Sequence, residues 1–177
     1  MTVIHPSITS KIESGNQKEI LEAVEVLISE GQADCLPTLI NLLHNTIDEQ
    51  VITAVNSMLR QLKQQDAVPY LIEAIADENF HDIREKLLIA CWENGLSYVK
   101  YIDVLIDIMI AADFMSAFEV HTLITNMWGK ITEDQLAVEE QKITDALLNV
   151  NAEKAVLLQE VKEYLHVLEE GVEPAEY

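Results

Sequence analysis

Basic residues are scarce in this sequence. It carries 11 lysines and arginines against 31 aspartates and glutamates, a formal net charge of −20 over 177 residues. Such a field repels phosphate groups, so it disfavours binding to nucleic acids and to anionic membranes. A basic protein or peptide is the complementary partner. Two other interpretations of the acidic surface stay open, namely that it keeps the protein soluble or that it mimics DNA.

Cysteine, glycine and proline are also scarce. Two cysteines cannot build a disulfide scaffold, and five glycines and four prolines are too few for a chain rich in linkers or β-turns. Cys35 and Cys91 lie in apolar stretches without metal-ligand spacing, so we expect reduced, buried thiols. The sequence shows no secretory signal and no apolar run near about 18 residues, so we expect a cytoplasmic location by default and no membrane association.

Sequence motifs of catalysis are absent too. There is no glycine-rich phosphate loop, no nucleophile elbow and no Cys-x-x-Cys pair. Glu163 and His166 form one Glu-x-x-His, the spacing found in di-iron sites, but such sites need a second copy and two further glutamates. We therefore expect no enzyme activity, no catalytic residues, no cofactor and no bound metal.

Apolar residues recur at helical spacing between Asp66 and Asn94. Two stripes are separated by a polar turn at residues 77–79, and Pro69 suits the first turn of the first helix. The first stripe comprises Val68, Leu71, Ile72 and Ile75, and the second comprises Ile83, Leu87, Ala90 and Cys91. Neither helix can bury its stripe alone, so the two should form a hairpin that needs stacked copies.

The chain supplies such copies at a period of roughly 32 residues. Residues 35–43 match residues 67–75, proline on proline, and residues 99–106 match residues 68–75. Two helices in each repeat of this length predict an all-α chain built as an α-solenoid.

The unit resembles a HEAT repeat, in which a proline opens the first helix and a short acidic turn precedes a Val-Arg-type pair. The matching residues are Pro69, Leu71, Asp77, Ile83, Arg84 and Leu87. The resemblance covers residues 33–129 and implies a right-handed α-solenoid of about four to five stacked helical hairpins. It further implies that the second helices line a concave surface that commonly holds other macromolecules, and that the family's acid-to-arginine ladder survives at Asp77 and Arg84.

The domain organisation that we expect is a single helical repeat domain followed by a flexible acidic tail. The domain spans residues 1–170, with an N-terminal cap at 1–31 that ends at Gly31, three repeats at 33–129, a C-terminal capping hairpin at 132–170, and the tail at 171–177. The outer face of the last hairpin is either solvated or a docking face for a basic partner or for a second copy of the chain, which would make a homodimer.

Aromatic residues are few but unevenly placed, since seven of the ten lie between Phe80 and Trp128. Trp92, Phe118 and Trp128 are expected to pack between repeats. Other aromatics and Met115 would partly surface as anchors, because interfaces are enriched in such residues, although a core role is the alternative. With polar residues of the second helices added, the candidate partner-binding residues are Tyr98, Tyr101, Phe114, Met115, Glu85, Glu119 and Asn126.

We interpret the chain as a non-enzymatic scaffold or adaptor that presents a concave helical surface to a protein or peptide, with a basic partner as one candidate. Two alternatives remain: an accessory or lyase-like factor that handles a prosthetic group, supported by the aromatic cluster, and the acidic DNA mimic.

Overall fold

The computed structural model describes residues 6–30 and 33–174. These residues form ten α-helices and four short 3-10 helices, and their extended backbone pairs at a single antiparallel bridge. The predicted all-α solenoid of stacked hairpins is thereby confirmed. The chain divides into two compact units, Met1–Leu96 and Ser97–Tyr177. The prediction of one domain with a cap, three repeats and a closing hairpin stays a prediction.

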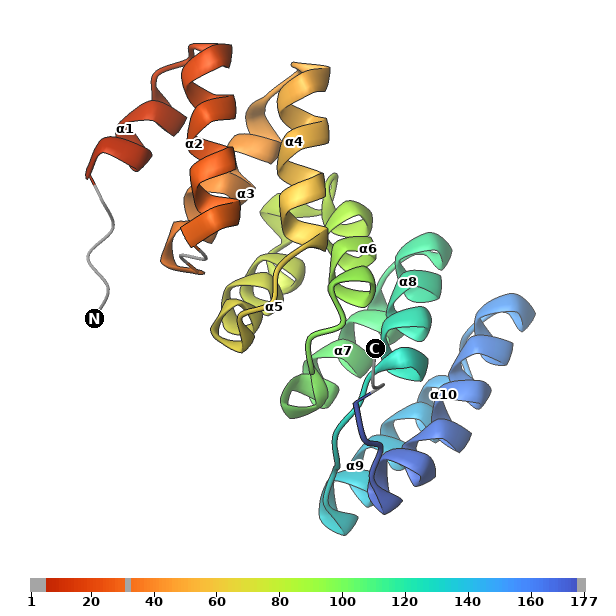
Figure 1. Cartoon of the computed structure of the whole chain (residues 1–177). Coiled ribbons are helices and arrows are strands. Elements are labelled where there is room, and N and C mark those ends of the chain that lie inside the picture. The colour runs from red at the N-terminus through yellow and green to blue at the C-terminus, as the bar shows by residue number, and fades with distance from the viewer. Residues whose placement is uncertain (1–5, 31–32, 175–177) are drawn as a thin grey trace. The chain divides into compact units, whose positions relative to one another are not determined.

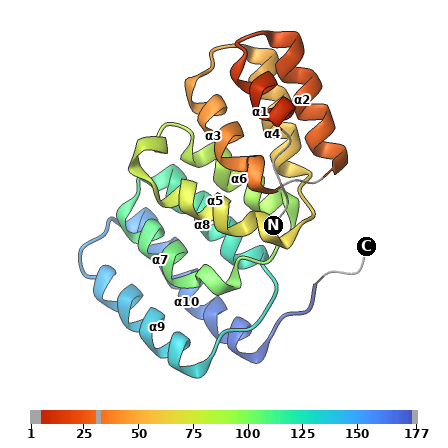
Figure 2. The ribbon, with the colours of Figure 1, turned by 90° about the vertical axis from the view of Figure 1, so that its left-hand side faces the viewer.

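The first unit is a stack of three helical hairpins. Its helices are α1 (Pro6–Glu13), α2 (Gln17–Glu30), α3 (Leu36–Asn45), α4 (Glu49–Arg60), α5 (Val68–Ala76) and α6 (Arg84–Asn94). Helices α1, α3 and α5 pack in one row and α2, α4 and α6 in the other, as Figures 1 and 2 show. The short 3-10 helices η1 (Ala33–Cys35), η2 (Gln65–Ala67) and η3 (Glu78–Phe80) lie in the connections.

The core of this unit consists of the apolar stripes that the sequence predicts. Leu39, Leu71 and Leu87 are fully buried, and both cysteines are buried and are not joined in a disulfide. Pro69 lies in the first turn of α5, where its missing N–H leaves no hydrogen bond unmade. The predicted stop of α2 at Gly31 lies outside the described residues.

The turn between α5 and α6 is held by Arg84 in a way that differs from the expected ladder. The guanidinium is buried, with Nε donating to the carbonyl of Ile75 at 2.8 Å and Nη2 to Oε1 of Glu78 at 2.7 Å. Asp77 instead accepts a hydrogen bond from the backbone N–H of Asn79 and so caps η3. The side chain of Asp77 is thus used by its own turn, and that of Arg84 by Ile75 and Glu78.

The second unit contains η4 (Val99–Tyr101) and two helical hairpins. The first hairpin is α7 (Ile102–Ala111) with α8 (Phe114–Asn126), and the second is α9 (Glu133–Ala146) with α10 (Ala152–Glu170). Helix α7 packs on α9, and α8 packs on α10. The first N–H groups of a helix have no partner within the helix, and a capping side chain that accepts a hydrogen bond from one of them stabilises the position at which the helix begins. Asp113, Thr132 and Asn151 cap α8, α9 and α10.

Two further contacts join the hairpins of the second unit. Lys154 of α10 is buried, and its Nζ donates to the carbonyls of Ile110 and Ala112 at the end of α7, both at 2.6 Å. Burial lowers the pKa of this ammonium group, although the nearby Asp113 opposes the shift. The ammonium group of Lys154 thus donates hydrogen bonds to carbonyl groups at the C-terminal end of α7, which have no partner within that helix.

The segment after α10 is paired with the segment before α9. Gly129 and Val172 form an antiparallel bridge, with N···O distances of 2.8 and 2.9 Å in the two directions. Gly129 has φ +128°, and a Cβ there would lie 2.6 Å from Cγ1 of Val99, so this close approach requires glycine. Val172 lies within the expected flexible acidic tail at residues 171–177, but it is paired with Gly129, so the expectation is corrected for this residue. Residues 175–177 lie outside the described part.

None of the helices in the described part of the chain combines the length and the apolar composition that crossing a bilayer requires.

Candidate functional site: a groove between α8 and α10

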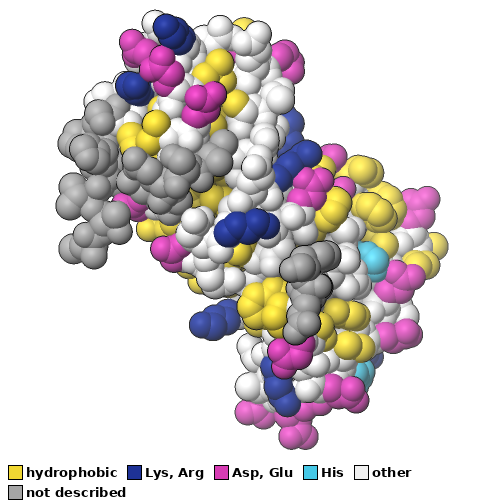
Figure 3. Space-filling model, viewed as in Figure 1, with side chains coloured by type: hydrophobic (Ala, Val, Ile, Leu, Met, Phe, Trp, Pro, Cys, Tyr) yellow, Lys and Arg dark blue, Asp and Glu magenta, His cyan; other side chains and the backbone are white. Residues whose placement is uncertain are grey.

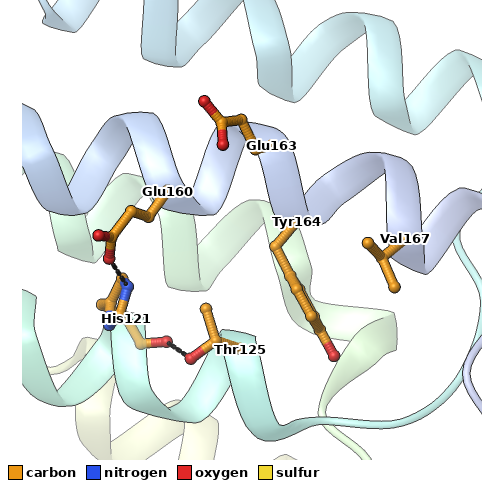
Figure 4. A pocket seen from close by; sticks show the side chains of 6 residues that line it. All are labelled: His121, Thr125, Glu160, Glu163, Tyr164 and Val167. Carbon is orange, nitrogen blue, oxygen red and sulfur yellow. Dashed lines mark hydrogen bonds and ion pairs between the residues drawn. The ribbon is translucent and has the colours of Figure 1, made fainter.

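The second unit carries a groove of about 350 Å³ between α8 and α10. His121 and Thr125 of α8 line it on one side, and Glu160, Glu163, Tyr164 and Val167 of α10 line it on the other (Figure 4). His121 faces Glu160, and the Tyr164 hydroxyl lies 3.5 Å from the carbonyl oxygen of Met127. The first contact joins residues 121 and 160, and the second joins residues 127 and 164, so the numbering rises in the same direction along both helices. The two helices therefore run parallel.

The groove follows from the periodicity of the two helices. On α8, Phe114, Phe118, His121 and Thr125 are spaced by three or four residues and form one stripe. The other side of α8 carries the buried Ala117, Val120 and Ile124. On α10 the groove stripe contains Val156, Glu160, Glu163 and Val167, and the core stripe contains Leu158, Val161 and Leu165. Packing of the core stripes therefore leaves the groove stripes facing solvent.

Large apolar side chains are exposed along this face. Phe114 and Phe118 are 39% and 43% exposed, with ring centroids 6.5 Å apart, and the ring of Phe118 stacks on His121 at 6.4 Å. Val156 and Val167 of α10 are also exposed. Figure 3 shows hydrophobic side chains gathered over α8 and α10 with acidic side chains around them. An exposed apolar patch with a polar rim is typical of an interaction site.

The charge of the groove is negative because the lysines of α10 turn away from it. Lys154 is engaged with the end of α7, and Lys162 donates to Oγ1 of Thr144 on α9 at 2.9 Å. Glu160 and Glu163 remain on the groove side, where Glu163 accepts a long hydrogen bond of 3.3 Å from the amide of Gln159. The groove stripe of α10 therefore presents carboxylates without a cation from its own helix.

His121 lies at the floor of the groove and is mostly buried. Its Nε2 lies 2.8 Å from Oε2 of Glu160, but the imidazole nitrogens are not aligned for a hydrogen bond with any described residue. The contact is therefore a short electrostatic approach rather than a well-directed bond. Glu160 itself is half exposed, so one side of its carboxylate remains open to a ligand.

The structure separates the candidate residues predicted from sequence. Phe114 and Met115 are exposed at the start of α8, and Asn126 is exposed at its end, where the amide donates to the carbonyl of Thr122. Tyr101 is half-buried in η4. Glu85 is exposed on α6, in the first unit. The first three thus share α8, and their role in binding stays a prediction.

Two of the predicted site residues are corrected by the structure. Tyr98 is fully buried just before η4, because a ring of this size stabilises the core by removing a large apolar area from water. Glu119 is also buried, on the core side of α8 next to Val120. Neither side chain is open to a partner. Phe118, which was expected to pack between repeats, is exposed instead.

Sequence reasoning missed Phe118, Glu160, Tyr164 and Val167 as members of one surface. The spacing of Phe114, Phe118 and His121 on one helix was the available signal. Glu163 and His166, singled out for their Glu-x-x-His spacing, point to different neighbours, since His166 Nε2 lies 3.0 Å from Oε1 of Glu140 on α9. Within the described residues, no group of three His, Cys, Asp or Glu side chains is arranged to hold a metal ion.

Stacked helical hairpins with an exposed groove between successive second helices define the protein as a helical-repeat protein. Residues 6–91, which lie within the first unit, match the family model of HEAT repeats. No curated protein matches the chain. HEAT repeats commonly serve as protein-interaction scaffolds and are generally non-enzymatic.

Proposed function

We propose that the chain is a non-enzymatic scaffold or adaptor that binds a protein or peptide through the exposed face of α8 and α10. The observation that carries this proposal is the pair of adjacent exposed phenylalanines, Phe114 and Phe118, on a helix whose core side is fully buried. Exposed aromatic side chains lower solubility unless a partner covers them, and interfaces are enriched in them.

The groove offers recognition chemistry rather than a reactive centre. Thr125, which brings a hydroxyl group to the groove, donates its proton to the carbonyl of His121 at 2.8 Å. His121 lies against Glu160, and within the part of the chain that the structure describes its ring nitrogens are hydrogen-bonded to no hydroxyl or thiol that the ring could activate. Together with the generally non-enzymatic character of HEAT repeats, this arrangement supports binding as the function. The acidic net charge makes nucleic acids and anionic membranes poor partners.

The test compares partners retained by the purified, immobilised chain and by its variants. A native extract is applied at low salt, the column is washed with high salt, and the eluted proteins are identified by mass spectrometry. We expect a protein that the wild type retains and that Phe114→Ser/Phe118→Ser loses. Ile47→Ser is the matched control, since Ile47 is an almost fully exposed apolar residue of the first unit. Identical retention by wild type and the phenylalanine variant would refute the proposal.

A further inference from the structure

The groove between α8 and α10 has chemically different regions along its length. The contacts of His121 with Glu160 and of Tyr164 with Met127 set the register of the two parallel helices. Phe114 and Phe118 therefore lie toward the starts of both helices, at the level of Val156. The carboxylate of Glu160 lies at the level of His121, and Glu163 and the ring of Tyr164 follow further along α10. One end of the groove is thus apolar, and the next region is acidic and aromatic.

The acidic region is suited to a single cationic side chain. Figure 4 shows the Tyr164 ring pointing from α10 toward α8, with Glu160 on one side of it and Val167 on the other, while the carboxylate of Glu163 points away from α8 at the outer rim. A guanidinium or ammonium group placed there would meet carboxylate oxygens and the face of an aromatic ring, which are the two groups that attract such cations most strongly. Lys154 and Lys162 are engaged elsewhere, so neither lysine of α10 fills this position.

Resting on the proposed function, we propose that this groove docks a short amphipathic segment of a basic partner. Apolar side chains of the segment cover Phe114, Phe118 and Val156, and a lysine or arginine enters beside Glu160 and Tyr164, with Glu163 at the outer rim of the groove. The stripe from Phe114 to Thr125 spans roughly 16 Å at 1.5 Å per residue, which is about three helical turns. The segment therefore needs only a few turns of helix, in the manner of other helices that bind in grooves.

Charge complementarity selects this occupant over the other candidates. A second copy of the chain would bring a net charge of −20 to a face whose rim is already acidic, and nucleic acid would bring phosphates to the same carboxylates. A basic segment is attracted by the long-range field and then held by the local pair of glutamates. Its binding should weaken as salt increases.

The experiment measures fluorescence anisotropy of a synthetic peptide that carries leucines at helical spacing in one half and arginines in the other. The control peptide has glutamate in place of each arginine. The full chain is compared with Glu160→Gln/Glu163→Gln, with Phe114→Ser/Phe118→Ser, and with Glu25→Gln/Glu73→Gln. The last variant removes the same number of charges from exposed positions of the first unit. Circular dichroism confirms that each variant is folded.

We expect the wild type to bind the arginine peptide and not the glutamate peptide. Glu160→Gln/Glu163→Gln removes two partly exposed ion pairs with the peptide, so its Kd for the arginine peptide should be about tenfold weaker than that of the wild type. The Kd of Glu25→Gln/Glu73→Gln should differ from that of the wild type by less than about twofold. Loss of the phenylalanines should weaken binding by a similar factor. Equal effects of the two glutamine variants would mean non-specific attraction and would overturn the proposal, as would absence of binding to the wild type.

These outcomes separate the inference from the function on which it rests. If the phenylalanine variant still loses its partner from the extract while the arginine peptide shows no groove-dependent binding, the interaction module stands and the basic segment is refuted. If sedimentation shows a dimer that the phenylalanine variant abolishes, the occupant is a second copy and the basic segment is likewise refuted. If the extract experiment fails as well, both proposals fall.

Discussion

His121 on α8 and Glu160 on α10 face each other across the groove, with Nε2 and Oε2 2.8 Å apart. The pair links the two hairpins of the second unit at the surface, but Glu160 is half exposed and the geometry is not that of a directed hydrogen bond. Partly exposed ion pairs contribute little to stability. Glu160→Gln should therefore lower the free energy of unfolding by less than about 1 kcal/mol in urea denaturation. A larger loss would show that the pair is part of the fold rather than of a binding surface.

The fully buried leucines of the first unit should be far more sensitive. Leu71→Ala or Leu87→Ala removes a side chain from the repeat core and leaves a cavity, which costs about 2–5 kcal/mol. Leu148→Ala, at an exposed turn position, is the matched control and should change little. Thermal melts followed by circular dichroism measure the difference. Unchanged melting of both buried variants would mean that the repeat alignment is wrong.

Exposed apolar residues at the start of α8 should be dispensable for folding. Phe114→Ser/Met115→Ser removes two partly exposed side chains, so we expect a change in stability of about 1 kcal/mol or less. Val120→Ser on the core side of the same helix should cost several times more, because it places a hydroxyl in a fully buried site. Similar melting temperatures for the two variants would contradict the assignment of the two faces.

The cap of α8 should make stability depend on pH in the acid range. Asp113 accepts a hydrogen bond from the backbone N–H of Ser116 at 2.9 Å, and this bond holds the pKa of the carboxyl below its usual value of 3.8. The unfolded chain binds the proton first, so the stabilisation is present above pH 3.8 and is lost as the pH falls through the folded pKa.

Asp113→Ala should therefore cost about 1 kcal/mol at neutral pH, and its difference from wild type should shrink in acid. Asp113→Asn keeps a capping oxygen without a titratable group, so it should not show this pH dependence of the cap. Urea titrations at several pH values measure all three proteins. A difference between wild type and Asp113→Ala that does not change with pH would exclude the carboxylate cap.

Gly129 should tolerate no side chain. Gly129→Ala combines a positive φ of +128° with a Cβ that would meet Val99, so we expect a loss of about 2–4 kcal/mol. Gly15→Ala is the control, since Gly15 has φ +69° and open space around it, and it should cost only about 1 kcal/mol. The denaturation midpoint of Gly15→Ala reports the backbone strain alone. The additional loss in Gly129→Ala reports the steric clash with Val99.

Helical periodicity predicted the fold well because the core depends on local spacing. Leu39, Leu71 and Leu87 occupy stripes that can be read along one helix, and all three are buried as expected. The same periodicity groups Phe114 with Phe118 but does not say which side of α8 faces the core. That choice depends on how α8 packs against α7 and α10, and this is why Phe118 was assigned to the core and Tyr98 to the surface.

The groove could not be predicted because it depends on pairs that are distant in sequence. Nothing in the neighbourhood of His121 indicates that Glu160 lies opposite, since the register of α8 and α10 is fixed by core side chains such as Leu165. The bridge of Gly129 with Val172 also gives no strand pattern, because it pairs single residues. Which residues of α8 and α10 form the groove therefore becomes clear only from the folded structure.

The bridge also determines how the second unit should respond to mechanical load. A force applied to the chain beyond Pro174 reaches Val172 first, where two backbone hydrogen bonds with Gly129 oppose it together. Helix α10 cannot peel away turn by turn until this bridge opens, and its peeling is then resisted by Lys154 at the other end of the helix. The last hairpin is thus fastened at both ends, and in a single-molecule pulling experiment it should yield in one abrupt step rather than by gradual fraying.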